Sequence, residues 1–455
     1  MFTREFLDTI MKAYDVRGLV DKEITPDFTF ALGASFARFL EEEREPATVV
    51  IGEDMRPSSP LLAQAFADGV TSQGFDAIRI GLASTDMAYF ASGKLNLPGA
   101  MFTASHNPAE YNGIKLCKSA ARPIGQETGL RRIRDLIVEG VPLSIRAMGK
   151  VTEQDMLTEY VDFLLSLFGP DLTSAERRLK VVIDAGNGMA GHTAPAVMAR
   201  LNVDVVPMYF ELDGTFPNHE ANPIDPANVV DLQKAVKKHK ADIGLAFDGD
   251  ADRCFLIDEN GAIVTPSALT ALIAVRELKR KPGSPVIYNL ISSKAVPEVV
   301  TENGGKPIRS RVGHSYIKAM MAETGAVFGG EHSGHFYFTD FWRADSGMLA
   351  ALFALAELSA SASTLSELLK PYNRYVLSGE INTKVSDTQE SLNLIRESFK
   401  QDYELDELDG VTVTAPEWWF NVRPSNTEPL LRLNVEAINE ATMKKVRDKV
   451  LELIG

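Results

Sequence analysis

Cysteine is scarce in this chain, since Cys117 and Cys254 are the only two among 455 residues. Two cysteines are too few for a disulfide framework or a structural zinc site. Long apolar runs are also missing: the longest, Met348 to Leu358, is shorter than a membrane span and is interrupted by Glu357. Residues 1–8 mix charges too early for a signal peptide. We therefore expect a reduced, cytoplasmic protein with no membrane partner.

Basic residues are fewer than acidic ones, with 47 Lys and Arg against 62 Asp and Glu and a net charge of −15. General nucleic-acid binders need a basic face, so nucleic acid is not an expected partner. A local basic pocket for a phosphorylated metabolite remains compatible with this balance. The hydrophobic share of 45% and the charged share of 24% are typical of soluble globular proteins. The length predicts three or four domains.

A unit of alternating strands and helical segments occurs three times along the chain. The first strands of the units are Thr48–Gly52, Val181–Asp184 and Pro285–Leu290, and the second strands are Ala77–Ile80, Val203–Val206 and Pro307–Ser310. A third apolar strand then ends in a polar loop, which is Thr103–His106, Asp248–Arg253 or Gly330–His335. This alternation predicts an α/β protein with three similar mixed α/β domains and mainly parallel sheets.

The pattern changes after about Leu369. Strands are expected at Val376–Val385, Leu408–Val413, Trp418–Val422 and Leu430–Val435, followed by an amphipathic helix at Ala441–Leu453. Strands and helices joined by short turns predict a small C-terminal α+β domain. The expected domains are residues 1–148, 149–255, 256–369 and 370–455.

The loop at residues 103–108, Thr-Ala-Ser-His-Asn-Pro, places Ser105 directly after the apolar run Gly99–Phe102. Asn107-Pro108 favours a turn that stops the strand. Open α/β sheets hold their reacting groups at the carboxyl ends of strands. The segment by itself fits either a hydrogen-bonded turn or a serine prepared for phosphoryl chemistry.

Asp248, Asp250 and Asp252 stand at alternate positions, where three carboxylates can point to one side of the backbone. Oxygen ligands of this kind suit Mg²⁺, which also accepts a phosphate oxygen. A calcium EF-hand begins in the same way, but Arg253 occupies the position that needs glycine and the flanks are strand-like. A solvated acidic turn is the weaker alternative, because adjacent carboxylates repel one another unless something neutralises them.

Gly186-x-Gly188-x-x-Gly191 after a strand fits the dinucleotide-binding pattern, with Glu211 near the position of the ribose acid. Such spacing arises often at strand–helix turns. The segment also contains Pro195, and the chain has no hydride-transfer set. We interpret the glycines as a tight structural turn.

Two further loops carry groups suited to a sugar phosphate. Residues 423–427, Arg-Pro-Ser-Asn-Thr, suit a phosphate, and a polar hairpin turn is an equal alternative. Residues 330–335, Gly-Glu-His-Ser-Gly-His, offer a carboxylate and a hydroxyl for sugar hydroxyls but not the helical His-Glu-x-x-His pattern of zinc. Tyr14 to Gly18, which contains Arg17, and Lys115 add two cations that are more often surface residues.

Together these segments resemble the α-D-phosphohexomutase superfamily, and within it the bacterial phosphomannomutase/phosphoglucomutase group, over nearly the whole chain. The resemblance implies four domains arranged around a central active-site cleft. It also implies a phosphoserine at Ser105, with Mg²⁺ held by Asp248, Asp250, Asp252 and that phosphate. The phosphoryl group would pass to a hexose phosphate and give a hexose 1,6-bisphosphate. This intermediate would then reverse its orientation in the cleft and return its other phosphate to Ser105.

The resemblance also implies the remaining site residues. The groups expected to handle charge and protons around Ser105 are His106, Lys115, Arg17, Arg253, His314 and His335. The groups expected to bind the sugar or its distal phosphate are Tyr14, Arg17, His314, Glu331, Ser333, His335, Arg423, Ser425, Asn426 and Thr427. His332 differs from other versions of its loop.

The implied reaction interconverts the 6-phosphate and the 1-phosphate of mannose or glucose. Small-molecule hexose phosphates are therefore the expected partners. A phosphoglucosamine mutase is the alternative within the family. A Mg²⁺-dependent sugar-phosphate phosphatase and a non-enzymatic sugar-phosphate sensor are alternatives from other classes. The sequence leaves monomer and homodimer undecided.

Overall fold

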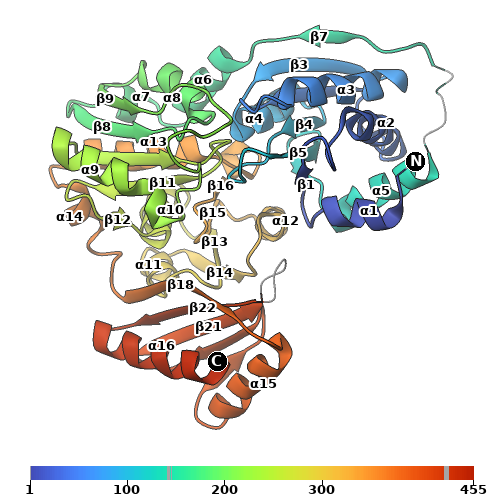
Figure 1. The fold of residues 1–455 in the computed structure, drawn as a ribbon. Coiled ribbons are helices and arrows are strands. Elements are labelled where there is room, and N and C mark those ends of the chain that lie inside the picture. The colour runs from blue at the N-terminus through green and yellow to red at the C-terminus, as the bar shows by residue number, and fades with distance from the viewer. Residues whose placement is uncertain (1, 141–143, 145, 425–429) are drawn as a thin grey trace. The chain divides into compact units, whose positions relative to one another are not determined.

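The computed structural model describes residues 2–140, 144, 146–424 and 430–455, apart from the side chains of residues 170, 171, 314 and 315. The chain forms two compact units (Figure 1). Unit 1 contains Met1–Thr265 and Ser333–Leu368, and unit 2 contains Pro266–His332 and Leu369–Gly455.

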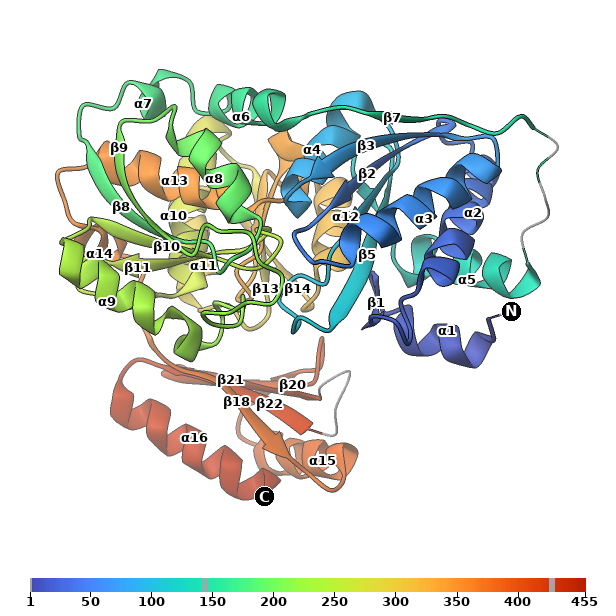
Figure 2. The same ribbon diagram turned by 45° about the horizontal axis from the view of Figure 1, so that its top comes forward.

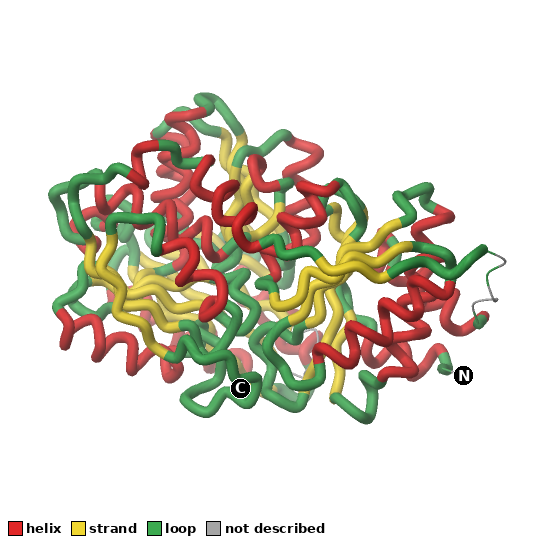
Figure 3. Tube along the Cα trace, turned by 90° about the horizontal axis from the view of Figure 1, so that it is seen from above, coloured by secondary structure: helices red, strands yellow, loops and turns green. Residues whose placement is uncertain are grey.

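Unit 1 begins with a seven-stranded mixed sheet in the order β1-β5-β4-β2-β3-β7, with β6 paired to β5. Its strands are β1 (Val16–Leu19), β2 (Thr48–Glu53), β3 (Asp76–Leu82), β4 (Gly99–Phe102), β5 (Tyr111–Lys118), β6 (Arg122–Pro123) and β7 (Val151–Glu153). Its helices are α1 (Arg4–Ile10), α2 (Pro26–Glu42), α3 (Ser59–Ser72), α4 (Thr85–Leu95) and α5 (Leu130–Glu139). Helices flank this sheet in the tube view of Figure 3.

The second sheet of unit 1 has five strands in the order β12-β11-β10-β8-β9. Its strands are β8 (Leu179–Asp184), β9 (Val203–Met208), β10 (Ile243–Phe247), β11 (Cys254–Asp258) and β12 (Ile263–Val264). The helices that follow in unit 1 are α6 (Leu157–Ser166), α7 (Pro170–Thr173), α8 (Ala190–Met198), α9 (Val230–His239) and α13 (Gly347–Ser359), with α14 (Leu365–Leu369) at its boundary. Unit 1 also contains an antiparallel pair of strands, β16 (Phe336–Phe338) and β17 (Ala344–Asp345).

Unit 2 contains three parallel strands in the order β14-β13-β15 and a separate antiparallel sheet in the order β18-β22-β21-β20-β19. The first set is β13 (Pro285–Asn289), β14 (Lys306–Ser310) and β15 (Phe328–Gly330), with α10 (Pro266–Arg280), α11 (Ala295–Glu302) and α12 (His314–Thr324). The second is β18 (Val376–Lys384), β19 (Glu404–Asp406), β20 (Val411–Thr414), β21 (Trp418–Pro424) and β22 (Leu430–Ala437). Helices α15 (Thr388–Phe399) and α16 (Glu440–Ile454) cover one face of this second sheet (Figure 2).

The repeated unit expected from the sequence is present three times. The parallel strands are β3-β2-β4 in the first copy, β9-β8-β10 in the second and β14-β13-β15 in the third. The first strand along the chain therefore lies at the centre of each trio, and the strand that precedes the polar loop lies beside it. This confirms the predicted α/β fold class with its C-terminal α+β domain.

One predicted strand was placed wrongly. Leu408–Val413 was expected to be continuous, but residues 408–410 form a bend and β20 begins at Val411. Gly410 has φ +71°, and Asp409-Gly410 lies in the loop of the β19–β20 hairpin, where Asp406 pairs with Thr412. Apolar Leu408 concealed this turn.

The apolar run at Met348–Leu358 lies in α13, whose described side chains from Gly347 to Ala356 are all buried. A helix that is apolar on every side fits the interior of a domain. Among the described residues, no helix combines the length and the apolar character needed to cross a bilayer.

Candidate active site

Ser105 lies in unit 1, three residues beyond the end of β4. Its side chain is buried, and its backbone has φ +51°, a conformation that is unfavourable for a residue with a Cβ atom. The Ser105 hydroxyl donates a hydrogen bond of 2.9 Å to Oδ2 of Asp248. Oγ also lies 3.2 Å from Nδ1 of His106. The two loops that the sequence analysis singled out therefore meet at this serine.

The three aspartates occupy the connection of the β10–β11 hairpin, in which Phe247 pairs with Cys254. Asp248, Asp250 and Asp252 are all buried, and one oxygen from each lies within 4.8 Å of the others. Burial and the neighbouring carboxylates raise the pKa of Asp248 to about 7, against the opposing effect of Arg253. Three carboxylates this close require nearby cations.

Two of those cations come from the described residues of unit 1. Lys115, on β5, donates hydrogen bonds of 2.7 Å to Asp250 and 2.5 Å to Asp252. Burial lowers the pKa of Lys115, but these two carboxylates outweigh burial and hold the pKa well above its usual range. Arg253 donates from Nε to Asp248 Oδ2 at 2.7 Å, and its Nη2 lies 3.5 Å from Ser105 Oγ.

The acidic loop fits a divalent cation of the Mg²⁺ type. Oδ1 of Asp250 is buried and accepts no hydrogen bond from any described residue. A buried carboxylate oxygen without a donor is costly unless a cation occupies its free side. Oxygen donors in a compact set are the ligands that Mg²⁺ takes in proteins. The donor chemistry therefore matches the predicted metal.

His106 and Arg17 flank the serine loop. Burial and the charges of Arg253 and Arg17 hold the pKa of His106 well below its usual value, so the ring is neutral at pH 7. Arg17 donates to Oδ1 of Asn107 and to Asp15, both at 2.5 Å, and its Nε is buried with no acceptor among the described residues. Tyr14 lies half-buried in the bend before β1.

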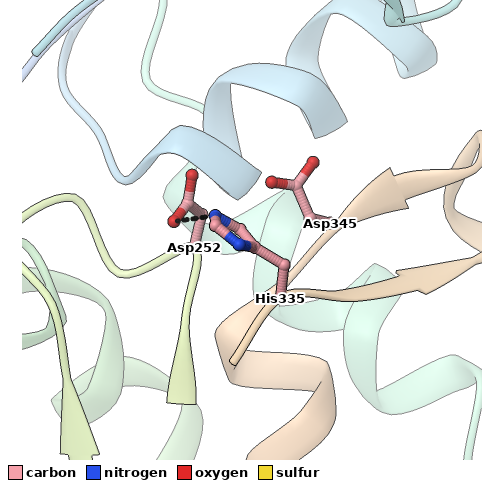
Figure 4. A group of neighbouring side chains, drawn as sticks. All are labelled: Asp252, His335 and Asp345. Carbon is pink, nitrogen blue, oxygen red and sulfur yellow. Dashed lines mark ion pairs between the residues drawn. The ribbon is translucent and has the colours of Figure 1, made fainter. Parts of the chain in front are cut away.

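His335, just before β16, lies beside Asp252 and Asp345 (Figure 4). Its Nε2 is 3.5 Å from Oδ1 of Asp252, and its Nδ1 is 2.9 Å from the hydroxyl of Ser333. Burial lowers the pKa of His335, but the charges of Asp252 and Asp345 together have the larger, opposite effect. The pKa of His335 is therefore raised above its usual value. A backbone bridge between Arg253 and His335 holds the histidine against the acidic loop.

The other predicted binding residues belong to unit 2. Glu331 is buried after β15 and accepts a hydrogen bond of 3.1 Å from the Gly313 N–H. Arg423, near the end of β21, donates to Glu380 at 2.7 Å, and its buried Nη1 has no acceptor among the described residues. Ser425, Asn426 and Thr427 lie outside the described residues, as does the side chain of His314.

Three buried residues around the loops were missed by the sequence analysis: Arg56, Thr85 and Asp345. Thr85, in the first turn of α4, donates from Oγ1 to Asp250 Oδ2 at 2.6 Å, and its N–H bonds to the Asp250 carbonyl at 2.9 Å. Arg56 and Thr85 follow β2 and β3, at the same sheet edge as the serine loop after β4. The repeated strand order could therefore have placed Arg56 and Thr85 near the serine loop, because the parallel strands that precede these residues end at one edge of the sheet.

The Gly186–Gly191 turn is packed against backbone. A Cβ atom on Gly191 would lie 2.3 Å from the Phe210 carbonyl oxygen, and one on Gly188 would lie 2.7 Å from the Gly249 carbonyl oxygen. These contacts are closer than any side chain tolerates, so the glycines are needed for packing. Gly188 therefore packs against the acidic loop, and Gly191 packs against the segment that follows β9.

Family models match all parts of the chain in order. Phosphoglucomutase/phosphomannomutase α/β/α domains I, II and III match residues 8–140, 158–261 and 265–375, and the C-terminal domain of the same family matches residues 380–453. Escherichia coli phosphomannomutase is 38% identical over 457 residues, covering 98% of this chain and 99% of the relative.

Two solved structures share the fold of this chain. A phosphoglucomutase/phosphomannomutase family protein from Burkholderia thailandensis is 31% identical, with a TM-score of 0.90 over 100% of this chain and 97% of that chain. Aspergillus fumigatus N-acetylphosphoglucosamine mutase, solved with GlcNAc-6P and magnesium, shares the fold at 14% identity and a TM-score of 0.62, over 100% of this chain and 96% of that chain.

The fold and these matches define a mutase, an isomerase that carries out an intramolecular phosphoryl transfer. The chain belongs to the phosphoglucomutase/phosphomannomutase family of the α-D-phosphohexomutase superfamily.

Proposed function

We propose that the protein interconverts the 6-phosphate and the 1-phosphate of mannose or glucose, through phosphorylated Ser105 and a hexose 1,6-bisphosphate. The observation that carries the proposal is the 2.9 Å hydrogen bond from Ser105 to Asp248 within a buried cluster of three carboxylates. Phosphoryl transfer depends on positioning and on charge stabilisation, and this arrangement supports both. The phosphomannomutase relative supports the choice of sugar.

Mg²⁺ is the proposed cofactor, held by Asp248, Asp250, Asp252 and the phosphate on Ser105. Oδ1 of Asp250, which is buried and has no hydrogen-bond donor within the described part of the chain, supports this assignment, as does the magnesium in the Aspergillus neighbour. When bound, the cation withdraws charge from the phosphoryl oxygens. Thr85 and Lys115 orient Asp250 for this purpose through their hydrogen bonds.

In the proposed first transfer, a sugar hydroxyl oxygen forms a bond to phosphorus while the bond from phosphorus to Ser105 Oγ breaks. Arg253, whose Nη2 lies 3.5 Å from Oγ, stabilises the charge that develops on the serine oxygen. In this proposal the proton of the sugar hydroxyl passes to the neutral form of His335, because Lys115, whose pKa Asp250 and Asp252 hold well above its usual range, is already protonated. In the second transfer Ser105 Oγ attacks the other phosphate of the bisphosphate, and the departing sugar oxygen takes a proton back.

The remaining predicted residues bind the substrate in this proposal. Glu331 and Ser333 take sugar hydroxyls that both orientations share, because a carboxylate and a hydroxyl suit such groups. The phosphate that is not reacting is assigned to Arg423, Ser425, Asn426 and Thr427. The buried Nη1 of Arg423, which has no acceptor among the residues that the structure describes, supports an anion at this place. Tyr14, Arg17, His106 and His314 complete the expected set.

A coupled assay with the 1-phosphates of mannose, glucose and glucosamine, each with a trace of hexose 1,6-bisphosphate, tests the proposal. Mannose and glucose phosphates should turn over with negligible release of inorganic phosphate. Fastest turnover of the glucosamine phosphate would favour a phosphoglucosamine mutase. Phosphate release that matches substrate consumption would favour a phosphatase, and no turnover of any sugar would contradict the proposed reaction.

A further inference from the structure

Arg56 is a fully buried arginine in the loop between β2 and α3, behind the serine loop. Its guanidinium donates four hydrogen bonds to backbone carbonyls of residues 105–111. Nη1 donates to Pro108 at 2.8 Å and to Tyr111 at 2.9 Å, and Nη2 donates to Asn107 at 2.7 Å and to Ser105 at 3.1 Å. One rigid planar group therefore fixes the whole loop that follows the serine.

The serine loop needs such support because of its backbone conformation. Ser105 has φ +51°, a backbone conformation that is unfavourable for a residue with a Cβ atom. Relaxation of Ser105 toward an ordinary φ changes the position of its carbonyl group relative to its N–H group, and Arg56 holds that carbonyl in place. The same backbone conformation directs Oγ toward Asp248. The hydrogen bonds of Arg56 thus oppose the relaxation that would turn the hydroxyl away.

The charge of Arg56 is balanced within the same loop. Nε lies 3.3 Å from Oδ2 of Asp54, which is also buried. Oδ1 of Asp54 accepts hydrogen bonds from the hydroxyl of Ser59 at 2.6 Å and from the Arg56 N–H at 3.0 Å. A lysine at position 56 would keep the ion pair but could not direct donors to four carbonyls at once. The geometry of the guanidinium can therefore be tested separately from its charge.

The segment that follows β9 in unit 1 encloses Arg56 from the other side. The guanidinium carbon lies 5.1 Å from the ring centroid of Phe216, within the range of a cation–π contact. A Cβ atom on Gly214 would lie 2.6 Å from the Arg56 Cα atom, so this backbone packs directly on the loop. The second sheet, which carries Asp248, thereby contributes to the position of the group that holds Ser105.

We propose that Arg56 is a positioning residue for phosphoryl transfer, which holds Ser105 in the left-handed conformation that presents Oγ to Asp248. This inference rests on the proposed role of Ser105 as phosphoryl carrier. Both terminal nitrogens of the guanidinium donate to the four carbonyls, and Nε faces the buried Asp54 in an ion pair, so Arg56 supports the loop without binding the phosphoryl group. Its loss should slow transfer while leaving substrate affinity nearly unchanged.

Arg56→Lys is the test variant, and Arg177→Lys is its matched control. Arg177 Nη1 also donates to three backbone carbonyls, those of Leu358, Ser361 and Ser363, and Nη2 pairs with Asp242 at 2.8 Å. The control therefore loses the same kind of support at a loop remote from Ser105. Three quantities are measured: kcat, KM and the rate at which glucose 1,6-bisphosphate phosphorylates Ser105. Mass spectrometry of the intact protein follows this phosphorylation.

Arg56→Lys should lower kcat and the rate of Ser105 phosphorylation by roughly 100-fold, with KM changed by less than about threefold. Arg177→Lys should keep both rates within about twofold of wild type, whatever its thermal stability. If wild-type protein does not become phosphorylated at Ser105, the proposed function fails. If wild type does and Arg56→Lys matches it within about threefold, the positioning role fails while the function stands.

Phe216→Leu provides a second variant if Arg56→Lys does not fold. It removes the ring over the guanidinium and leaves the four carbonyl hydrogen bonds in place. Transfer to Ser105 should slow by roughly fivefold to tenfold with KM unchanged, since the guanidinium loses one of its confining contacts. Wild-type transfer rates in folded Phe216→Leu would then count against the proposal.

Discussion

The hydroxyl of Ser105 and Oδ2 of Asp248 lie 2.9 Å apart, although 143 residues separate them in the chain. The serine follows β4 of the first sheet, and the aspartate follows β10 of the second. Each strand is the third of its repeat, so equivalent loops of two copies meet at one point. The repetition of one α/β unit thereby brings the serine loop and the acidic loop together.

Replacement of Ser105 by alanine should reduce mutase activity by roughly 10³-fold or more, because the proposed reaction carries the phosphoryl group on the Ser105 hydroxyl. Asp248 Oδ2 would still accept the hydrogen bond from Arg253 Nε, so the free energy of unfolding should change by only about 1 kcal/mol. The assay of sugar-phosphate exchange and thermal unfolding measure the two effects. Ser58→Ala, which removes an acceptor for Asn112 at 2.8 Å, is a control that should stay active. Substantial exchange in Ser105→Ala would contradict the mechanism.

Two overlapping groups of side chains could hold the proposed cation, and mutation can show which of them does. Asp248, Asp250 and Asp252 form one group, and Asp252, His335 and Asp345 form the other. Asp250→Asn should weaken Mg²⁺ binding by on the order of tenfold or more, since it removes one charged ligand. Asp345→Asn should change it by less than about twofold. Isothermal titration with Mg²⁺ separates the cases, and a larger loss of affinity in Asp345→Asn than in Asp250→Asn would assign the metal to the second group.

The repeated strands could be predicted from the sequence because the same succession of apolar runs and polar loops occurs three times along the chain. The Asp409-Gly410 turn was missed because apolar residues stand on both sides of it. The three aspartates could be predicted as a metal site from their spacing, whereas the serine segment by itself also fits a hydrogen-bonded turn and was assigned through the combination of motifs. Their functional roles remain predictions that the experiments above test.

Contacts between distant segments could not be predicted in the same way. The hydrogen bond from Thr85 to Asp250 and the ion pair of Lys115 with Asp252 depend on how two sheets pack. Arg56 gave no signal of its own, because one arginine in a polar loop is usually a surface residue. Only the folded chain shows that its donors end on the serine loop.

Asp86 should make stability depend on pH. Burial raises its pKa to about 6, although it accepts hydrogen bonds from Ser346 at 2.6 Å, from Tyr160 at 2.7 Å and from Ser84. A carboxyl whose folded pKa is raised stabilises the fold at low pH, and this contribution is lost as pH rises through about 6. Tyr160 and the charge of Asp252 are the titratable groups that bear on it.

The shift from 3.8 to about 6 corresponds to about 3 kcal/mol in total, of which about 2 kcal/mol falls between pH 4.5 and pH 7.5. Asp86→Asn cannot titrate, so the stability of wild type relative to this variant should fall by that amount over the interval. Chemical unfolding of both proteins at the two pH values measures it. A difference that is constant with pH would show that Asp86 has an ordinary pKa.

Gly249 should be essential for activity rather than for the fold alone. A Cβ atom there would lie 2.4 Å from the Ser105 carbonyl oxygen, and the Gly249 carbonyl accepts a 2.8 Å hydrogen bond from Met189 just before α8. Alanine must therefore push the acidic loop and the serine loop apart. We expect kcat to fall by roughly 10-fold to 100-fold and the free energy of unfolding to fall by about 1–3 kcal/mol.

Gly191→Ala is the matched control, because its Cβ would meet the Phe210 carbonyl oxygen at 2.3 Å, away from Ser105. Both variants introduce the same kind of backbone clash, so both should lose stability to a similar degree. Only Gly249→Ala changes the separation of Ser105 and Asp248. Measured per mole of folded protein, kcat should therefore fall in Gly249→Ala and stay near wild type in Gly191→Ala. Equal losses of kcat in the two variants would mean that general destabilisation, and not the spacing of the two loops, limits the reaction.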